Sequence, residues 1–231
     1  MKTYKHLKIG DLVTKDFRAA EVFKRAGIDF CCGGDQTLEE ACRSKKLDLA
    51  SIEMQLSTLD NSEPDFSHNF KAWNLDFLCD YIVNTHHKTV LNLLPQLTSY
   101  TEKIATVHGE NHPELLEIAT LFSQINTELL QHLKNEEEVL FPAIKEVLKT
   151  ESAEAKATII SEISRMSDEH EFAGGAMDKI NMLSRGYLVP EDGCNTYRVT
   201  YKLLEEFEDD LHIHVHLENN ILYPKALKLA I

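Results

Sequence analysis

The sequence predicts an all-α protein in which a small helical domain precedes an up-down bundle of four long helices. Gly and Pro are sparse, with 9 and 6 copies in 231 residues, and apolar side chains recur at helical spacing through most of the chain. Short connections between the four long segments place consecutive helices antiparallel to each other. We expect the small domain over residues 1–60, a linker over 61–72 and the bundle over 73–231.

The small domain is expected to contain three short helices. The first covers residues 14–26 and carries its apolar side chains on one face. After a turn at 30–35, Thr37 and Glu40 form a capping-box pattern that opens the second helix. The third covers 48–59, and the polar residues that follow it, with one proline among them, form the linker.

The bundle is expected to contain four long helices, at residues 74–106, 113–149, 152–185 and 195–229. Pro113 suits the first position of the second helix, because a backbone N–H there would have no partner within the helix. Three further prolines should kink or end the helices in which they fall: Pro95, Pro142 and Pro224.

The composition excludes several classes of partner. The formal net charge of −14 repels phosphate backbones and anionic lipids, so we expect no nucleic-acid partner and no membrane binding. No apolar run approaches the roughly 20 residues of a membrane span, and the N-terminus lacks a signal-peptide core. The cysteines are odd in number and lack C-x-x-C spacing, which favours reduced thiols in a cytoplasmic protein. They are Cys31, Cys32, Cys42, Cys79 and Cys194.

An internal repeat supplies the first chemical signal. The second and fourth long helices carry the same pattern of His, Glu four residues later, and then Leu, an aromatic residue and Pro. Residues four apart share one helix face, so each pair can offer an imidazole and a carboxylate together. A single His–Glu pair would indicate an ordinary charged helix surface, but its repetition in a second helix favours a metal site. The pairs are His132 with Glu136 and His214 with Glu218.

The heights of four histidines strengthen this interpretation. Each long helix carries one: His87, His132, His170 and His214. Neighbouring histidines lie 23 and 22 residues from the turn near Glu110, 19 and 19 from Glu151, and 20 and 24 from Pro190. With a rise of about 1.5 Å per residue, all four fall at similar heights in an up-down bundle.

Four imidazoles and two carboxylates are more than one tetrahedral zinc ion uses. They suit two iron ions, with Glu136 and Glu218 each bridging both. A bridging oxide or hydroxide would balance part of the remaining charge and leave a coordination position for a small ligand. The sequence therefore predicts a di-iron centre.

The other histidines fit the site less well. His87 rather than His86 is expected to face inward, because apolar residues flank it at helical spacing. His108 should lie near the end of the bundle, with a capping or surface role. His212 and His216 flank a predicted ligand at spacing two and should point elsewhere. Two glutamates could support the ligands from behind or lie on solvated faces: Glu128 and Glu169.

These motifs together resemble the iron–sulfur cluster repair di-iron proteins, of the ScdA or repair-of-iron-centres type, over essentially the whole chain. The N-terminal part is similar through Asp29-Phe30-Cys31-Cys32-Gly33-Gly34 and Gln36-Thr37-Leu38, and the bundle is similar to a haemerythrin-like domain through its His and Glu motifs. The resemblance implies a di-iron centre that serves to restore clusters damaged by nitric oxide or peroxide. Members of this family commonly have a histidine at the position of His108, and it has been considered a possible metal ligand. The expected height of His108 in the bundle argues against that role here.

The chain departs from oxygen-carrying haemerythrins, which pair two histidines four apart on the third helix. Here Gly174 stands four residues after His170, and Gly175 follows. We expect the small residues to leave space near the metal and the missing imidazole to make the site more open. That arrangement suits release of iron or binding of a small ligand.

The adjacent Cys31 and Cys32 form a second chemical feature, predicted to be functional. The alternative is a pair of small buried residues at a turn. Gly33 and Gly34 would let a backbone or ligand approach, and a helix N-terminus near Thr37 would favour thiolate. The pair could relay iron, bind the iron of a damaged cluster, or react with nitric oxide, and the residues do not choose among these.

Three functions follow from the sequence. The leading hypothesis is a stress-response protein that supplies iron to iron–sulfur proteins as clients. The alternatives are a di-iron enzyme that turns over nitric oxide or peroxide, and an oxygen sensor or carrier. The oligomeric state is left open, with a homodimer as one option.

Overall fold

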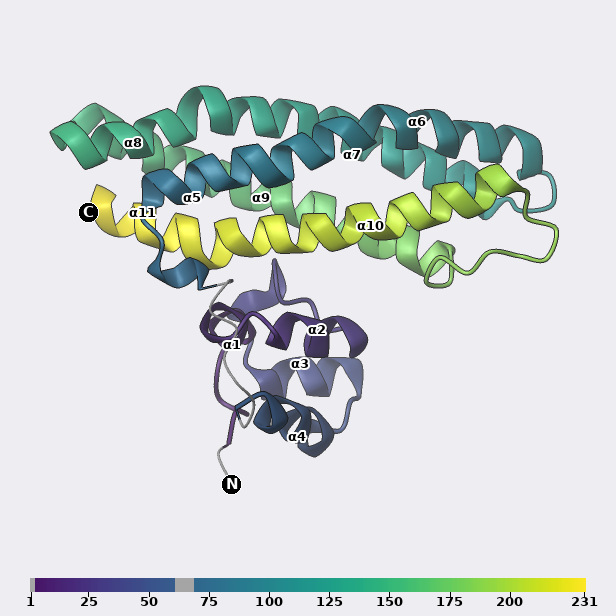
Figure 1. Cartoon of the computed structure of the whole chain (residues 1–231), viewed down its shortest axis with the longest axis horizontal. Helices are drawn as coiled ribbons and strands as arrows, with labels where there is room; N and C mark the ends of the chain where they lie inside the picture. The colour runs from purple at the N-terminus through teal and green to yellow at the C-terminus, as the bar shows by residue number, and fades with distance from the viewer. Residues whose placement is uncertain (1–2, 61–68) are drawn as a thin grey trace.

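The computed structural model describes residues 3–60 and 69–231, and it confirms the all-α prediction: in these ranges every regular element is a helix or helical turn. Figure 1 shows long antiparallel helical rods forming an elongated bundle, with the small N-terminal domain packed against one side of it. One isolated bridge, between Lys8 and Thr37, ties the start of the small domain to its turn region.

The small domain has four helices around its own apolar core, one more than expected. They are α1 (Ile9–Lys15), α2 (Ala19–Arg25), α3 (Leu38–Lys45) and α4 (Leu49–Asp60), with a 3-10 turn at Gly33–Asp35 between α2 and α3. The expected single helix over 14–26 is wrong. The backbone of Asp16 is extended, with φ −145° and ψ 102°, and its carboxylate accepts the N–H of Arg18 at 3.1 Å. This local hydrogen bond holds the chain in a turn between the end of α1 and the start of α2.

The capping box at Thr37 is confirmed. The Thr37 hydroxyl accepts the N–H of Glu40, and the Glu40 carboxylate accepts the N–H of Thr37 at 2.9 Å. Most of the expected linker, residues 61–68, lies outside the described residues. Its last part forms a 3-10 turn, Phe70–Ala72, whose Phe70 ring packs 4.8 Å from that of Trp73.

The bundle contains the four expected long helices, and three of them pass through a π-helical turn. The first consists of α5 (Leu75–Ile82), the π-turn Val83–His87 and α6 (Lys88–His108). The second consists of α7 (Glu114–Asn135), the π-turn Glu136–Leu140 and α8 (Phe141–Thr150). The third is α9 (Ala153–Leu183), and the fourth consists of α10 (Asn195–Leu217), the π-turn Glu218–Leu222 and α11 (Tyr223–Ala230).

Two π-turns begin at the glutamates of the repeat and end just before its prolines. The N–H of Phe141 bonds to the carbonyl of Glu136, and the N–H of Tyr223 bonds to that of Glu218, each five residues back. Pro142 and Pro224 follow directly and lack an N–H of their own, which favours the local change in winding. Pro95, by contrast, lies inside α6 and does not end it.

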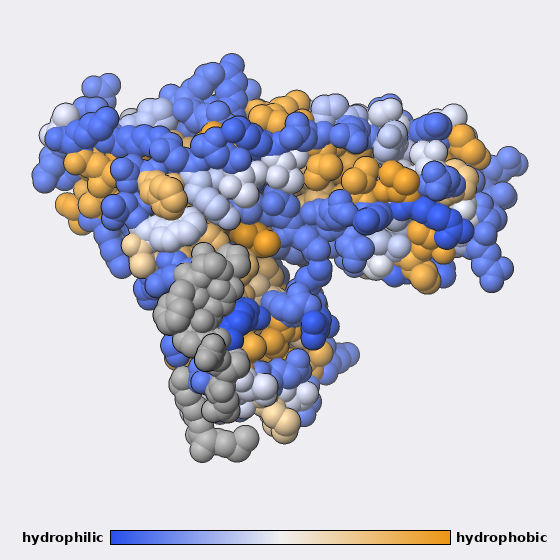
Figure 2. All heavy atoms as spheres, in the orientation of Figure 1, coloured by the Kyte–Doolittle hydropathy of each residue, from blue (hydrophilic) through white to orange (hydrophobic). Residues whose placement is uncertain are grey.

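The bundle has two apolar clusters along its length, and buried His and Glu side chains lie between them. Figure 2 shows that the visible surface of the bundle is mainly hydrophilic, with apolar patches between the charged side chains. Among the described residues, no helix combines the length and the apolar character that crossing a membrane requires.

The two parts of the chain dock through a close backbone contact. A Cβ added to Gly10 or Gly34 would lie 2.2 or 2.4 Å from Oδ1 of Asn220, so only glycine lets the small domain approach this side chain. A salt bridge of 2.6 Å between Lys24 and Asp209 supports the same interface. The π-turn Glu218–Leu222, which belongs to the bundle, therefore also contacts the small domain through Asn220.

Candidate metal centre

The six predicted donors come together in the middle of the bundle, and each is at most 2% exposed. The first three long helices contribute His87, His132 with Glu136, and His170, and the fourth contributes His214 with Glu218. The π-turns matter here because both glutamates and His87 lie on them. The structure thus places all four histidines at one level, as their separations along the sequence predict.

The donors form two groups that share Glu218. In the first, Nε2 of His214 lies 2.9 Å from Oε1 of Glu218, with His87 and Glu136 beside them. In the second, Nε2 of His170 lies 3.2 Å from Oε2 of Glu218 and 3.1 Å from Nε2 of His132. The two oxygens of one carboxylate therefore face two different sets of imidazoles.

Glu136 is oriented differently from Glu218. Its Oε2 atom lies 3.3 Å from Nε2 of His87 and 3.4 Å from Nε2 of His132, between the two groups. Its Oε1 atom accepts a hydrogen bond of 2.9 Å from the hydroxyl of Tyr223. One oxygen is therefore directed at the donors and the other at a tyrosine.

Several polar atoms at the centre have no hydrogen-bond partner within the described part of the chain: Nε2 of His87, Oε2 of Glu136 and Oε2 of Glu218. Buried polar atoms without partners are costly, and cations placed between these donors would satisfy them. The donor set therefore fits metal ions.

Charge balance supports the same conclusion. Burial opposes protonation of His87 and His132, yet the neighbouring glutamates raise the pKa of each imidazole to about 10. Burial likewise opposes ionisation of Glu136, but the imidazoles lower its pKa to about 2. The carboxylates hold positive charge at this position, so metal binding must displace protons from the imidazoles.

Three of the four predicted donor imidazoles are held from behind by a second side chain. Nδ1 of His87 lies 2.8 Å from Oε1 of Glu137, and Nδ1 of His132 lies 2.8 Å from Oε2 of Glu169. Nδ1 of His170 lies 2.8 Å from the amide oxygen of Asn219. Such contacts fix the ring orientation and the tautomer. The sequence indicated Glu169 as a supporting residue but not Glu137 and Asn219, each of which directly follows a predicted ligand. Glu128, the other supporting residue considered, is exposed.

His86 is buried as well as His87, which the sequence did not predict. Its Nδ1 lies 2.9 Å from Oδ1 of Asp210, and its ring stacks on His214 with centroids 5.6 Å apart. It stands behind a predicted ligand and belongs to neither donor group. His216 points away from the centre, with Nδ1 3.4 Å from the carbonyl of Phe30.

His108 lies at the last position of α6, as the height argument predicts. Its Nε2 lies 3.2 Å from Sγ of Cys194, at the start of α10. This hydrogen bond is the main reason why the pKa of the exposed Cys194 thiol is lowered to about 7. His108 therefore contacts a thiol and not the six donors.

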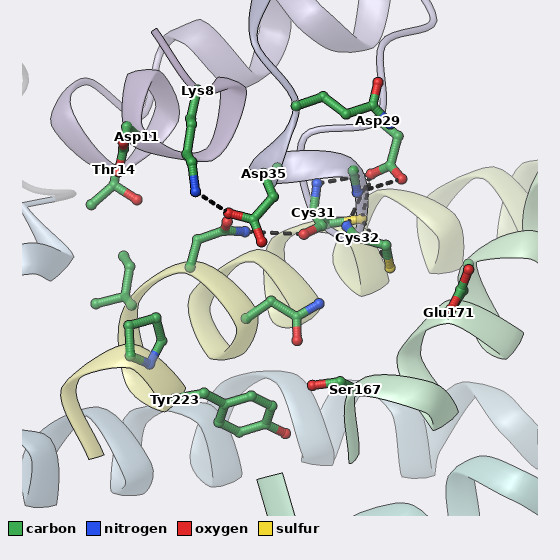
Figure 3. A pocket seen from close by; sticks show the side chains of 18 of the residues that line it. Lys8, Asp11, Thr14, Asp29, Cys31, Cys32, Asp35, Ser167, Glu171 and Tyr223 are labelled. Atoms are coloured by element: carbon green, nitrogen blue, oxygen red, sulfur yellow. Dashed lines mark hydrogen bonds and ion pairs between the residues drawn. The ribbon is translucent and has the colours of Figure 1, made fainter. Parts of the chain in front are cut away.

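The cysteine pair lies where the small domain meets α9. The Sγ atoms of Cys31 and Cys32 are 3.9 Å apart, and Sγ of Cys32 lies 3.5 Å from the carbonyl oxygen of His170. The carboxylate of Asp29 accepts the backbone N–H groups of Cys31, Cys32 and Gly33 at 2.9, 3.0 and 2.8 Å (Figure 3). The pair lines a cavity of about 1000 Å³ between the two parts of the chain.

The expectation of a thiolate is wrong for Cys31. The hydrogen bond with Cys32 and burial raise the pKa of its thiol well above the usual range. The helix N-terminus at Thr37 does not offset these effects, because the 3-10 turn and Gln36 stand between it and the pair.

The space expected at Gly174 lies elsewhere than predicted. A Cβ at this position would be 3.3 Å from Sγ of Cys32, so the glycine makes room for the small domain on the outer side of α9. The missing side chain thus brings the cysteine pair close to the helix that carries His170.

Comparison with known proteins gives matches over both parts of the chain. Residues 5–60 match the ScdA_N domain, described as a domain of unknown function (DUF542), and residues 80–226 match the hemerythrin HHE cation binding domain. The chain is 34% identical over 219 residues to the iron-sulfur cluster repair protein ScdA of Staphylococcus epidermidis, covering 94% of this chain and 96% of that protein. It is 36% identical over 225 residues to the iron-sulfur cluster repair protein YtfE of Yersinia pestis, covering 97% and 98%.

Proposed function

The chain belongs to the family of iron–sulfur cluster repair proteins, and from this premise we propose that its bundle holds two iron ions and supplies iron to damaged clusters. The family and the buried His and Glu donors together establish a metal-binding bundle in a repair protein. The observation that carries the proposal of two ions is the position of Glu218, whose two oxygens face two separate groups of imidazoles.

The donor types favour iron. Imidazole nitrogens and carboxylate oxygens suit iron in non-haem sites, and no cysteine belongs to either donor group. His87 and His214 would hold one ion and His132 and His170 the other, and the carboxylates of Glu218 and Glu136, which lie between the two groups, would serve both. An oxide or hydroxide bridge would balance part of the remaining positive charge.

Supply of iron fits the surroundings of the second group. The interdomain cavity reaches α9 beside His170, and the cysteine pair lines it from the side of the small domain. Cysteine thiolates bind iron in iron–sulfur clusters, and an incoming ion would have to displace the proton of Cys31, whose pKa is raised. The proposed clients are iron–sulfur proteins whose clusters have been damaged by nitric oxide or peroxide.

Metal analysis should find about two irons per chain after loading with ferrous iron in the absence of oxygen. X-ray absorption should show nitrogen and oxygen ligands and no sulfur in the centre, because the six donors include no thiol. One tightly held zinc ion with no uptake of iron would contradict the assignment.

The repair function is tested by restoring a cluster enzyme that nitric oxide has inactivated. Iron-loaded protein should restore its activity, and the amount of iron lost by the donor should match the amount gained by the client. The apo protein is the control and should restore nothing. Steady-state consumption of nitric oxide or peroxide with a reductant, without transfer of iron to the client, would instead favour the alternative of a di-iron enzyme.

A further inference from the structure

The two halves of the internal repeat differ beside the metal centre at the aromatic residue that precedes each proline. At the position after each π-turn, the second helix has Phe141 and the fourth has Tyr223. The Phe141 ring stacks on His87 with centroids 5.7 Å apart, and the Tyr223 ring stacks on His170 at the same distance. The two rings occupy equivalent places, so at this position the halves differ by the tyrosine hydroxyl.

This hydroxyl makes the two carboxylates unequal. Tyr223 is 2% exposed and donates its hydrogen bond to Oε1 of Glu136 at 2.9 Å. Glu218 keeps both oxygens directed at imidazoles, whereas Glu136 directs only Oε2 at them. A carboxylate oxygen that accepts a short hydrogen bond has less negative charge to offer a cation.

The support behind the imidazoles is unequal in the same sense. His87 and His132 each contact a carboxylate through Nδ1, but His170 contacts the neutral amide of Asn219. A neutral acceptor increases the basicity of an imidazole less than a carboxylate does, so it makes the imidazole a weaker ligand. Among the three imidazoles with a side-chain partner at Nδ1, His170 therefore has the weakest support, and it lies on the side of the tyrosine hydroxyl. Nδ1 of His214, in the other group, has no hydrogen-bond partner within the described part of the chain.

The same side borders the interdomain cavity. Tyr223 and Asn219 both line it, and Figure 3 shows Tyr223 on the bundle side of the cavity, across from Cys31 and Cys32. Phe141 does not line this cavity. The cavity therefore reaches two side chains that contact the donors directly: Tyr223, which bonds to Glu136, and Asn219, which bonds to His170.

We propose that Tyr223 is a positioning residue that keeps the metal ion at His132 and His170 exchangeable, by holding Oε1 of Glu136 away from it. The ion at His87 and His214 is then the slower of the two to leave. This inference rests on the proposed two-iron centre and adds which ion leaves and which residue controls its departure. Removal of the hydroxyl would free Oε1 for the metal and tighten the exchangeable ion.

The test measures release of iron from the loaded, full-length protein into an excess of a ferrous chelator. The wild-type protein should release its two irons in two phases of equal amplitude. Tyr223→Phe should slow the fast phase by about tenfold or more, as expected for a hydrogen bond to a charged group, and leave the slow phase unchanged. Tyr197→Phe is the matched control, because it removes a buried hydroxyl that bonds only to Tyr201 in the other apolar cluster.

Two further variants identify the half from which the fast iron leaves. Asn219→Asp gives His170 a carboxylate and should also slow the fast phase, whereas Glu137→Gln weakens the support of His87 and should accelerate only the slow phase. Faster release from Tyr223→Phe, or equal changes in both phases, would overturn the inference and leave the two-iron centre standing. Binding of fewer than two irons by the wild-type protein would overturn the proposed centre itself.

Discussion

Glu218→Ala should lose both metal ions and destabilise the bundle at the same time. The carboxylate is fully buried, and its two oxygens face the two groups of imidazoles separately, at 2.9 Å from His214 and 3.2 Å from His170. Its removal leaves the imidazoles of His87 and His132, whose pKa values the glutamates raise, with one buried carboxylate in place of two. Loss of one partner from such a buried charged group typically costs about 3–5 kcal/mol of unfolding free energy. Iron content after loading and chemical denaturation of the apo protein measure the two effects separately.

The control for this experiment is His108→Ala. His108 is also a histidine of the bundle, but it contacts Cys194 at the end of α6 and none of the six donors. This variant should keep both irons and a visible spectrum like that of the wild type. Retention of two irons by Glu218→Ala, or loss of one from His108→Ala, would show that the ligand assignment is wrong.

The level of the metal centre could be predicted because it depends on local geometry alone. Helical rise is nearly constant, so separations from the turns fixed the heights of His87, His132, His170 and His214. The π-turns add one residue to a helical turn but leave the height almost unchanged. The repeat of His and Glu four apart then identified the inward faces of two helices.

The partners behind the imidazoles could not be predicted in the same way. Glu169 approaches His132 from another helix, and the rotation of neighbouring helices about their axes depends on packing along their full length. Tyr223 was visible in the sequence only as the aromatic residue of the repeat. Its contact with Glu136 joins the fourth helix to the second.

How the small domain packs against the bundle also could not be predicted from the sequence. Gly10, Gly34 and Gly174 each allow close approach, but a glycine does not reveal its neighbour in the fold. Gly174 was therefore expected to open space near the metal, whereas it faces Cys32. The break at Asp16 was missed for a related reason, since one side-chain hydrogen bond outweighs helical periodicity there.

The cysteine pair should be required for repair but not for binding of iron in the bundle. Cys32 contacts the backbone carbonyl of His170 on the outer side of α9, and the six donors all come from the bundle. The double variant Cys31→Ser/Cys32→Ser should therefore keep two irons and its visible spectrum. If the pair receives iron from the centre or engages the client, the variant should lose most of its ability to restore a damaged cluster enzyme.

Cys194→Ser provides the matched control, because Cys194 is an exposed thiol at the start of α10 and lies outside the interdomain cavity. It should keep both its iron and its repair activity. Full repair by the double variant would show that Cys31 and Cys32 only fill the turn between the two parts of the chain. Loss of iron from it would show that the docked small domain stabilises the centre, since Cys32 reaches the helix that carries His170. Retained iron with lost repair would separate storage in the bundle from transfer at the interface.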